Sequence, residues 1–240
     1  MSDPGGLPGP VVCIVGPTAS GKSAVADEVA LALGSAVVSV DAMQVYRGMD
    51  VGTAKTPVGQ RRAPLEMVDV ADPGQDYSVA LFQNQARAVT SRLLDHGLTP
   101  VLCGGTGLYL NAVIDEMSFP AGKQGDEPRG EYAQIARTRG SQALWDLLRE
   151  RDAPSAELIH PNNAKRVVRA LEMLDEGTSY AVHHRGLHAR LPHYDARVWG
   201  LTMGRERLYG RIDRRVDMMM EQGLLDEVRD LKGHGLTLDT

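Results

Sequence analysis

Short apolar runs alternate with longer amphipathic stretches in the first half of the chain. Three runs rich in β-branched residues, Val11 to Val15, Ala36 to Val40 and Pro100 to Cys103, are typical of strands buried on both faces of a parallel sheet. Two stretches between them, Ser23 to Leu33 and Ala80 to Leu94, have the apolar spacing of helices. This alternation predicts an α/β fold with a three-layer parallel sheet, in which ligands bind at the carboxyl ends of the strands.

The pattern changes after Asn111. Strand-like runs almost vanish, and the polar stretch 120–130, which contains Gly and Pro, is typical of a domain boundary. Helical spacing follows in Gln142 to Arg151 and in Ala164 to Glu176. We therefore expect residues 115–190 to form a mainly helical insertion domain.

The pattern of the first half returns after the insertion. Arg197 to Thr202 is strand-like, and Arg205 to Leu231 predicts a long helix with a break near Gly223. The core domain is thus predicted to consist of residues 11–114 and 195–240.

The composition is that of an ordinary globular protein, with 42% hydrophobic and 24% charged residues among 240. Residues 1–10 lack the basic and apolar parts of a signal peptide, and we interpret them as a flexible leader. No stretch approaches the roughly 20 apolar residues that span a bilayer, which favours a cytoplasmic protein without membrane contact. Cys13 and Cys103 lie in apolar runs and are predicted to be core side chains.

The charge is unevenly distributed. The formal net charge of −5, taken as an average, argues against a nucleic-acid partner. Between Arg185 and Arg215, however, eight arginines stand against three acidic residues. This basic segment is either a solvated helix face or part of a binding site, and the charge pattern alone leaves both open.

The first predicted strand runs directly into a phosphate-binding loop. The pattern G-x-x-x-x-G-K-[ST] is matched by Gly16, Pro17, Thr18, Ala19, Ser20, Gly21, Lys22 and Ser23. In such a P-loop, backbone N–H groups turn toward phosphate oxygens, the lysine adds positive charge, and the last hydroxyl can ligate Mg²⁺. The motif predicts a P-loop NTPase-like fold that binds a diphosphate, or a triphosphate such as ATP, with Mg²⁺ as cofactor. It does not select a reaction, because kinases and NTPases share it.

Two further strand ends carry polar groups. Asp41 follows the second strand, so its carboxylate is expected to face the phosphates and to accept a proton from a nucleophile or to hold Mg²⁺ through water. The alternative is a cap for a helix that begins near Met43. Gly104, Gly105, Thr106 and Gly107 follow the third strand and place one hydroxyl on a glycine-rich turn.

Three strings of residues together carry a family resemblance. They are Gly16 to Ser23, Asp41 to Lys55 and Gly104 to Tyr109, and they are joined by His160 to Asn163, Lys165 to Glu172, Arg211 to Arg215 and Gly223 to Val228. The chain resembles the tRNA dimethylallyltransferases, which attach an isoprenoid to an adenine beside the anticodon. The resemblance covers nearly the whole chain from Val11 onward.

The resemblance implies a reaction. The donor is expected to be dimethylallyl diphosphate, and the acceptor N6 of adenosine 37, in the anticodon stem-loop of tRNAs that read codons beginning with U. Asp41 would accept the proton of N6, while Thr106, Arg215 and the P-loop would stabilise the leaving diphosphate. The base must turn out of the stacked loop to reach the site. We expect a monomer.

The resemblance also implies the residues that contact tRNA. Those expected at the active site are Asp41, Ala42, Met43, Gln44 and Thr106, and those expected on a helix of the insertion are Lys165, Arg166, Val167, Val168 and Arg169.

The chain departs from the family pattern in two places. Family members usually carry Pro-His-His or Pro-His-Arg before Leu-x-Asp, whereas this chain has Pro64, Leu65, Glu66, Met67, Val68 and Asp69. The basic C-terminal segment of the family is also absent from this sequence. Three alternatives therefore stay open: an adenylate isopentenyltransferase, a P-loop kinase of a small metabolite, and an inactive tRNA-binding module.

Overall fold

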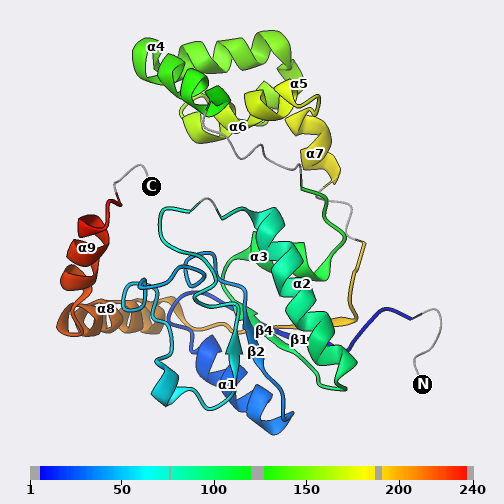
Figure 1. The fold of residues 1–240 in the computed structure, drawn as a ribbon, viewed down its shortest axis with the longest axis vertical. Coiled ribbons are helices and arrows are strands. Elements are labelled where there is room, and N and C mark those ends of the chain that lie inside the picture. Colours follow the sequence, from blue (N-terminus) through cyan, green and yellow to red (C-terminus); the bar gives the residue numbers. More distant parts are fainter. Residues whose placement is uncertain (1–5, 76, 120–126, 187–190, 237–240) are drawn as a thin grey trace. The chain divides into compact units, whose positions relative to one another are not determined.

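The chain folds into two compact units. The computed structural model describes residues 6–75, 77–119, 127–186 and 191–236, and Figure 1 shows its fold. Unit 1 contains Met1–Glu116 and Leu191–Thr240, and unit 2 contains Met117–Arg190. Unit 2 thus begins two residues later than the insertion expected from the sequence.

A five-stranded sheet organises unit 1. Its strands are β1 (Val11–Val15), β2 (Val37–Ser39), β3 (Leu65–Glu66), β4 (Val101–Gly104) and β5 (Ala196–Gly200). Their order is β3-β2-β4-β1-β5, and every pairing is parallel, with Val12 beside Val101 and Val11 beside Ala196. The parallel α/β sheet predicted from the apolar runs is confirmed. β3 was not predicted, because two residues are too short for a recognisable alternation.

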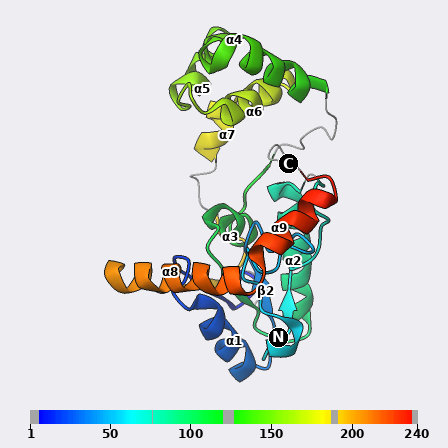
Figure 2. The same ribbon diagram turned by 90° about the vertical axis from the view of Figure 1, so that its left-hand side faces the viewer.

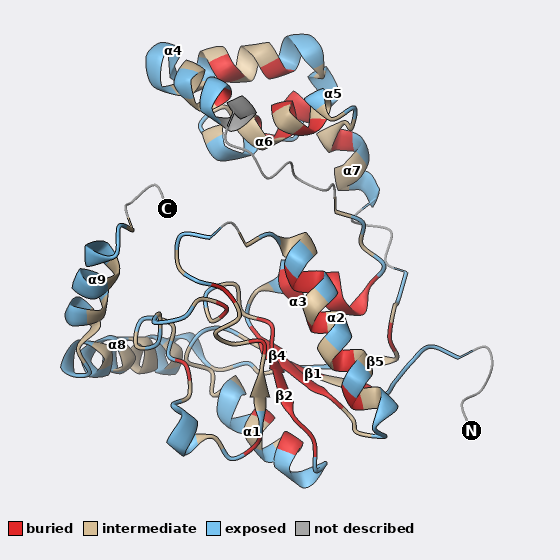
Figure 3. Cartoon of the chain, viewed as in Figure 1, coloured by how far each residue is buried: buried red, intermediate tan, exposed pale blue. Residues whose placement is uncertain are grey.

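Helices cover both faces of the sheet. α1 (Lys22–Ala32) packs Ala26 and Ala30 against one face, whereas α2 (Val79–Asp95) and α3 (Gly107–Ile114) pack against the other. Within β1, Cys13 belongs to the cluster under α2 and α3, and Ile14 to the cluster under α1, as alternation in a strand requires. These three layers bury the central strands, as Figure 3 shows.

Two further helices of unit 1 follow β5. α8 (Arg205–Glu221) and α9 (Leu224–Gly233) are separated at Gly223, which has φ 93° and so terminates the first helix, as predicted. None of the residues of α8 or α9 is buried. Figure 2 shows α8 beside α1 and α9 turning away from the axis of α8. A short 3₁₀ helix, Val58–Gln60, precedes β3.

The edge strand β5 remains largely open to solvent. Trp199 is 64% exposed and Val198 is 52% exposed. Because neighbouring residues of a strand point to opposite faces, β5 is open to solvent on both faces at this point. On the N-terminal side of the sheet, the N–H of Asp195 donates to the Pro8 carbonyl at 2.8 Å. Part of the predicted leader therefore contacts the fold, while residues 1–5 lie outside the described part of the chain.

The described part of unit 2 consists of helices joined by turns and irregular segments. It contains α4 (Glu127–Arg151), α5 (Ala153–Glu157), α6 (Ala164–Asp175) and α7 (Tyr180–Gly186). α4 begins well before the predicted Gln142, and its path is interrupted at Gly140, whose φ is 85°. The core of the unit includes Leu144, Leu148 and Leu171, and the half-buried Trp145 donates its indole N–H to the carbonyls of Ala156 and Ile159.

Two sequence-level expectations about single residues and segments have clear outcomes. Cys13 and Cys103 are both buried with free thiols, as predicted, and burial raises the pKa of Cys13 to about 12. The basic segment is divided between the two units: Arg185 lies in the last turn of α7 in unit 2, whereas the arginines from Arg197 onward belong to unit 1, and Arg190 lies outside the described residues. In the part of the chain that is described, no helix has the length and apolar character needed to cross a bilayer.

Candidate active site at the carboxyl edge of the sheet

The P-loop, residues Gly16 to Ser23, joins the end of β1 to the start of α1. A Cβ added at Gly16 would lie 2.9 Å from the Leu201 carbonyl oxygen, so the packing there admits only glycine without a shift. Gly21 has φ 95° and forms the N-cap of α1, which lets the loop turn sharply into the helix. The Ser20 N–H donates to the Pro17 carbonyl at 3.2 Å and closes the turn.

Positive side chains surround this loop. The Lys22 ammonium donates to the Pro17 carbonyl at 3.3 Å, and the Arg211 guanidinium of α8 donates from Nε to the Ala19 carbonyl at 2.6 Å. Arg211 therefore ties α8 to the P-loop. Sequence reasoning gave Arg211 no role, although it lies in one of the strings that carried the resemblance.

Three cavities that share residues meet at the P-loop. The cationic cavity, of about 570 Å³, is lined by Lys22, Ser23, Arg211, Arg214 and Arg215, together with Asp217, Glu221 and apolar groups. The central cavity is small, about 70 Å³, and contains Lys22, Ser23, Asp41 and Arg215. The apolar cavity, of about 470 Å³, contains Asp41 and Arg215 and is walled by Met43, Met49, Ile212, Met219, Leu224 and Val228.

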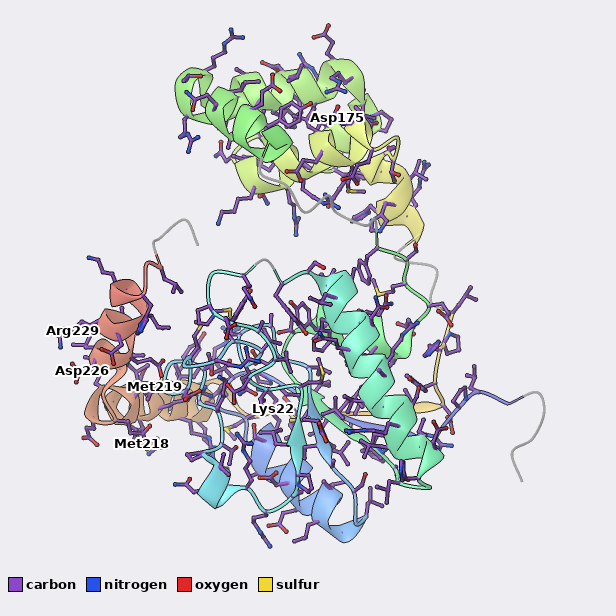
Figure 4. All side chains as sticks on the ribbon, viewed as in Figure 1. Lys22, Asp175, Met218, Met219, Asp226 and Arg229 are labelled. Carbon is purple, nitrogen blue, oxygen red and sulfur yellow. The ribbon has the colours of Figure 1, made fainter. Side chains whose placement is uncertain are left out.

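Arg215 borders all three cavities, and Asp41 borders the central and apolar ones. The structure therefore brings two of the three predicted catalytic residues, Asp41 and Arg215, together with the P-loop. Lys22, in the P-loop, and Met219, on α8, mark the cationic and apolar sides of this region in Figure 4. Each cavity is formed by unit 1 alone.

The Asp41 side chain caps a turn and also borders a cavity. Its Oδ1 accepts a hydrogen bond from the Met43 N–H at 2.9 Å, as a cap does, although Met43 begins a turn rather than a helix. The half-buried carboxylate also borders the central cavity. Burial, and then the neighbouring Tyr46 and Asp41, raise the pKa of Tyr109 to about 12, so the Asp41 charge acts on its surroundings.

Thr106 is held beside Asp41 rather than in a cavity. It is the N-cap of α3, and its Oγ1 accepts from the Ala42 N–H at 3.3 Å. It is absent from the linings of the three cavities described above. The hydroxyl predicted to contact diphosphate and tRNA thus fixes the backbone next to the proposed base.

Gly104 and Gly105, which precede Thr106, let the backbone of this turn lie close to Val40 and Lys22. A Cβ on Gly104 would collide with the Val40 carbonyl, and one on Gly105 would lie 3.7 Å from Lys22 Nζ. The charges of Lys22 and Asp41 also act on Cys103, which directly precedes these glycines. Burial raises its pKa to about 11, and the charges of Lys22 and Asp41 act in opposite directions on it.

The segment from Asp41 to Lys55, called here the 41–55 loop, holds the predicted base-reading residues. Gln44 Nε2 donates to the Thr53 carbonyl at 3.1 Å, and its Oε1 accepts from the buried Ser39 hydroxyl at 2.9 Å. Ala42 and Gln44 are half-buried, whereas Met43 is 47% exposed. The orientation of the Gln44 amide is therefore fixed from two sides.

A buried ammonium anchors the far end of this loop. Lys55 has a side chain only 3% exposed, and it contacts Asp50 at 2.8 Å and Asp69 at 2.6 Å as well as the Tyr46 carbonyl. A buried charge requires such partners. Sequence reasoning included Lys55 in a family string without assigning it this task.

The segment from Pro64 to Asp69, which departs from the family pattern, makes structural contacts in unit 1. Leu65 and Glu66 form β3, and Glu66 pairs with Arg92 of α2 at 2.8 Å. Met67 is buried and Asp69 binds Lys55. The two replaced positions, Leu65 and Glu66, therefore lie in the edge strand β3, whereas the retained Asp69 supports the 41–55 loop.

The predicted tRNA contacts of the insertion divide into two kinds. Lys165 and Arg166 are exposed on α6, whereas Val167 is completely buried in the core of unit 2 and Val168 is packed against that core. Arg169 is half-buried and pairs with Glu172 at 3.3 Å. The Val167 side chain is unavailable to a surface partner, because helical spacing turns it to the inside of the unit.

The donor set at the P-loop is suited to Mg²⁺. The Ser23 hydroxyl and the Asp41 carboxylate border the same central cavity, and both are hard oxygen ligands. The described residues contain no cluster of three or more His, Cys, Asp or Glu side chains that could hold a metal by themselves. Mg²⁺ commonly uses one or two protein oxygens and completes its shell with phosphate and water, so this pair fits such an ion.

Comparisons with known proteins give the same picture over most of the chain. The family model described as IPP transferase matches residues 44–239, and the one described as isopentenyl transferase matches residues 9–61. The tRNA dimethylallyltransferase of Symbiobacterium thermophilum is 43% identical over 92% of this chain and 70% of its own length. That of Shouchella clausii is 42% identical over 95% of this chain and 73% of its own length.

Solved structures are similar as well. The tRNA isopentenylpyrophosphate transferase of Bacillus halodurans is 41% identical, with a TM-score of 0.64 over 95% of this chain and 71% of that protein. A eukaryotic dimethylallyltransferase acting on tRNA is 26% identical, with a TM-score of 0.78 over 93% of this chain and 56% of that protein. With a P-loop, Asp41 and Arg215 meeting at one edge of a parallel sheet, and with these likenesses, the chain belongs to the IPP transferase family.

Proposed function

We propose that the protein transfers a dimethylallyl group from dimethylallyl diphosphate to N6 of adenosine 37 in tRNAs that read codons beginning with U. The observation that carries this proposal is that Asp41, Lys22, Ser23 and Arg215 line one cavity. A carboxylate that can accept a proton thus lies next to groups that can hold a diphosphate. Curated relatives named tRNA dimethylallyltransferase support the same reaction.

The diphosphate would bind at the P-loop. Backbone N–H groups at the start of α1, Lys22 and Arg215 offer donors and positive charge where the leaving group gains negative charge. Arg214 borders the same cationic cavity and would add to this field. Mg²⁺, held by Ser23 and through water by Asp41, would neutralise diphosphate charge when bound.

The acceptor would be activated by Asp41. The exocyclic amine of adenine is a weak nucleophile, because its lone pair is delocalised into the ring. As the N6–carbon bond forms, the bond between the allylic carbon and the diphosphate oxygen breaks, the electron pair leaves with the diphosphate, and Asp41 takes one N6 proton. No nucleoside triphosphate is consumed, since the donor contains its own leaving group.

The flipped base would enter through the apolar cavity. Met43 and Met49 present polarisable apolar surface there, and Gln44, which lines the adjoining central cavity, offers an amide whose orientation is fixed. Extruding the base costs unstacking energy, which stacking and edge contacts in a pocket offset. Lys165 and Arg166 of unit 2 would contact the RNA backbone. A tRNA-modifying role also fits the cytoplasmic location and the monomeric state expected from the sequence.

Transfer to RNA tests the proposal directly. Purified protein, Mg²⁺ and radiolabelled dimethylallyl diphosphate should label an anticodon stem-loop that has adenosines at positions 36, 37 and 38. A stem-loop with guanosine at position 37 serves as the control and should stay unlabelled. Equal labelling of both, or labelling of neither, would contradict the proposal.

Two further measurements separate the alternatives. An adenylate isopentenyltransferase would label AMP in preference to the stem-loop under the same conditions. A small-metabolite kinase would bind ATP with micromolar affinity and more tightly than dimethylallyl diphosphate in a calorimetric titration. We expect neither result, because the allyl diphosphate is the proposed cargo of the P-loop.

A further inference from the structure

One carboxylate of α9 holds three consecutive backbone amides of the 41–55 loop. Glu227 Oε2 accepts from the N–H groups of Asp50 and Val51 at 2.8 and 2.7 Å, and Oε1 accepts from the N–H of Gly52 at 3.0 Å. The two segments are 175 or more residues apart in the chain. Nothing in the reaction proposed above uses Glu227.

The chemistry of this contact makes it strong and directional. Three successive N–H groups that converge on one anion form a concave nest, and bonds to a charged acceptor are stronger than those between neutral groups. A carboxylate has enough lone pairs to accept all three, whereas a carboxamide has one acceptor oxygen and would oppose an N–H with its own N–H. Glutamine at this position would therefore lose at least one bond and create a clash between donors.

Close packing supports the same contact. A Cβ added at Gly52 would lie 3.3 Å from Glu227 Oε1 and 3.2 Å from Leu224 Cδ1. A side chain at position 52 would thus require Leu224 and Glu227, or the loop, to shift by a few tenths of an ångström. Glu227, Gly52 and Leu224 all border the apolar cavity, so the contact also shapes its wall.

The contact reaches the predicted base-reading residue in two steps. Gly52 is followed by Thr53, whose carbonyl accepts from Gln44 Nε2 at 3.1 Å and whose hydroxyl donates to the Met49 carbonyl at 2.5 Å. The opposite side of the Gln44 amide is fixed by Ser39 of β2. Glu227 thus sets the position of the Thr53 carbonyl that, with Ser39, orients Gln44.

We propose that Glu227 is a positioning residue for the acceptor base: its carboxylate fixes the backbone at 50–52 and thereby the Gln44 amide and the wall of the apolar cavity. The proposal rests on the function proposed above for its kinetic consequences, but the contact itself can be tested without activity. The donor site is served by the P-loop and α8, so donor binding does not depend on Glu227.

The experiment compares Glu227→Gln with Asp226→Asn. Asp226 precedes Glu227 in the first turn of α9. Among the described contacts, its side chain pairs only with the exposed Arg229 (Figure 4). Replacing Asp226 by Asn therefore removes the same charge near the same helix end. Amide hydrogen exchange in a peptide that spans residues 50–52 should be faster by about 10-fold or more in Glu227→Gln and unchanged in Asp226→Asn.

Steady-state kinetics with the stem-loop give the second measurement. Glu227→Gln should lower kcat/KM for the RNA by about 10- to 100-fold, because small displacements of a binding group have effects of this size. The KM for dimethylallyl diphosphate should change less than about twofold, since the P-loop is untouched. Gly52→Ala should reproduce both the faster exchange and the loss with RNA while Glu227 is intact.

Each proposal can fail separately. Unchanged exchange at 50–52 in Glu227→Gln, or a loss with RNA no larger than that of Asp226→Asn, would overturn the role of Glu227. A parallel rise in the KM of the donor would also overturn it, because that indicates general loosening of unit 1. If the unsubstituted protein transfers nothing to RNA, the proposed function fails, and the exchange experiment still decides whether Glu227 holds the loop.

Discussion

The two loops that meet at the carboxyl edge of the sheet are held in different ways. The P-loop closes on itself within a few residues, through Pro17 and the αL glycine at the start of α1, and Arg211 ties it to α8. The 41–55 loop is anchored at Lys55 and depends in its middle on Glu227 of α9. A local motif therefore forms the proposed diphosphate site, whereas long-range contacts shape the proposed acceptor site.

The difference also has a chemical side. Arg211 of α8 donates to a carbonyl of one loop, and Glu227 of α9 accepts from amides of the other. The Arg211 contact uses a carbonyl of the P-loop and so leaves the N–H groups of that loop available to an anion. The Glu227 contact, in contrast, uses three N–H groups of the 41–55 loop. Only the first loop is thus left suited to bind phosphate.

The largest effect is expected at Asp41, which belongs to the 41–55 loop and lines a cavity together with P-loop residues. Asp41→Asn keeps the Oδ1 acceptor for Met43 but removes the proton acceptor, so kcat for transfer should fall by about 10²- to 10⁴-fold. The KM for dimethylallyl diphosphate should stay nearly constant. Single-turnover rates at saturating donor would measure this, and a fall of less than about threefold would remove Asp41 from the role of base.

Arg211→Met should loosen the P-loop and leave the 41–55 loop unchanged. It removes the hydrogen bond to the Ala19 carbonyl and a positive charge from the cationic cavity, and the KM for the donor should rise by about 5- to 20-fold. The KM for the stem-loop should change little. If both values rise equally, the two loops are mechanically coupled and the comparison above is wrong.

The exposed cations of unit 2 should affect RNA binding alone. Replacing Lys165 and Arg166 by Ala should reduce the slope of log affinity against log salt by about 0.7 for each lost phosphate contact. Arg139→Ala, on the exposed surface of α4, is the matched control and should leave the slope unchanged. Fluorescence anisotropy of a labelled stem-loop at several salt concentrations would measure this, and an unchanged slope in the double variant would exclude these residues from the interface.

The smallest expected effect concerns the sheet beneath both loops. Burial raises the pKa of Cys103 to about 11 and that of Cys13 to about 12, well above the ordinary value of a cysteine thiol, so the folded state disfavours the thiolates. Their contribution to stability is present below about pH 9 and is lost as pH rises toward 11, because the unfolded chain releases those protons first. Urea unfolding at pH 8 and pH 10 should show a smaller decline for the Cys13→Ala, Cys103→Ala double variant than for the unsubstituted protein. An equal loss of stability from pH 8 to pH 10 in both proteins would show that the two thiols do not cause it.

Much of the fold was accessible from the sequence, because its signals are local. Three β-branched runs predicted β1, β2 and β4, the strand-like pattern of Arg197 to Thr202 predicted β5, and Gly223 predicted the break between α8 and α9. Several elements escaped, and β3 and α3 show why. β3 is only two residues long, and α3 begins inside a glycine-rich turn whose composition disguises a helix.

The candidate site was accessible only in part. The P-loop, Asp41 and Arg215 stand in recognisable strings, and the structure brings them to one cavity. Arg211 and Glu227 stand in such strings too, but their partners are backbone groups more than 170 residues away, which no sequence pattern specifies. Val167 shows the reverse case: it lies in a string of expected tRNA contacts, yet helical periodicity places it in a core.

The two tryptophans give each unit its own optical reporter. Trp145 is half-buried in unit 2 with its indole N–H bonded to two carbonyls, whereas Trp199 is 64% exposed on the edge strand of unit 1. A Trp199→Phe variant would emit only from the helical unit, and a Trp145→Phe variant only from the sheet. Unfolding followed in the two variants would therefore show whether the units melt together or as independent cooperative blocks.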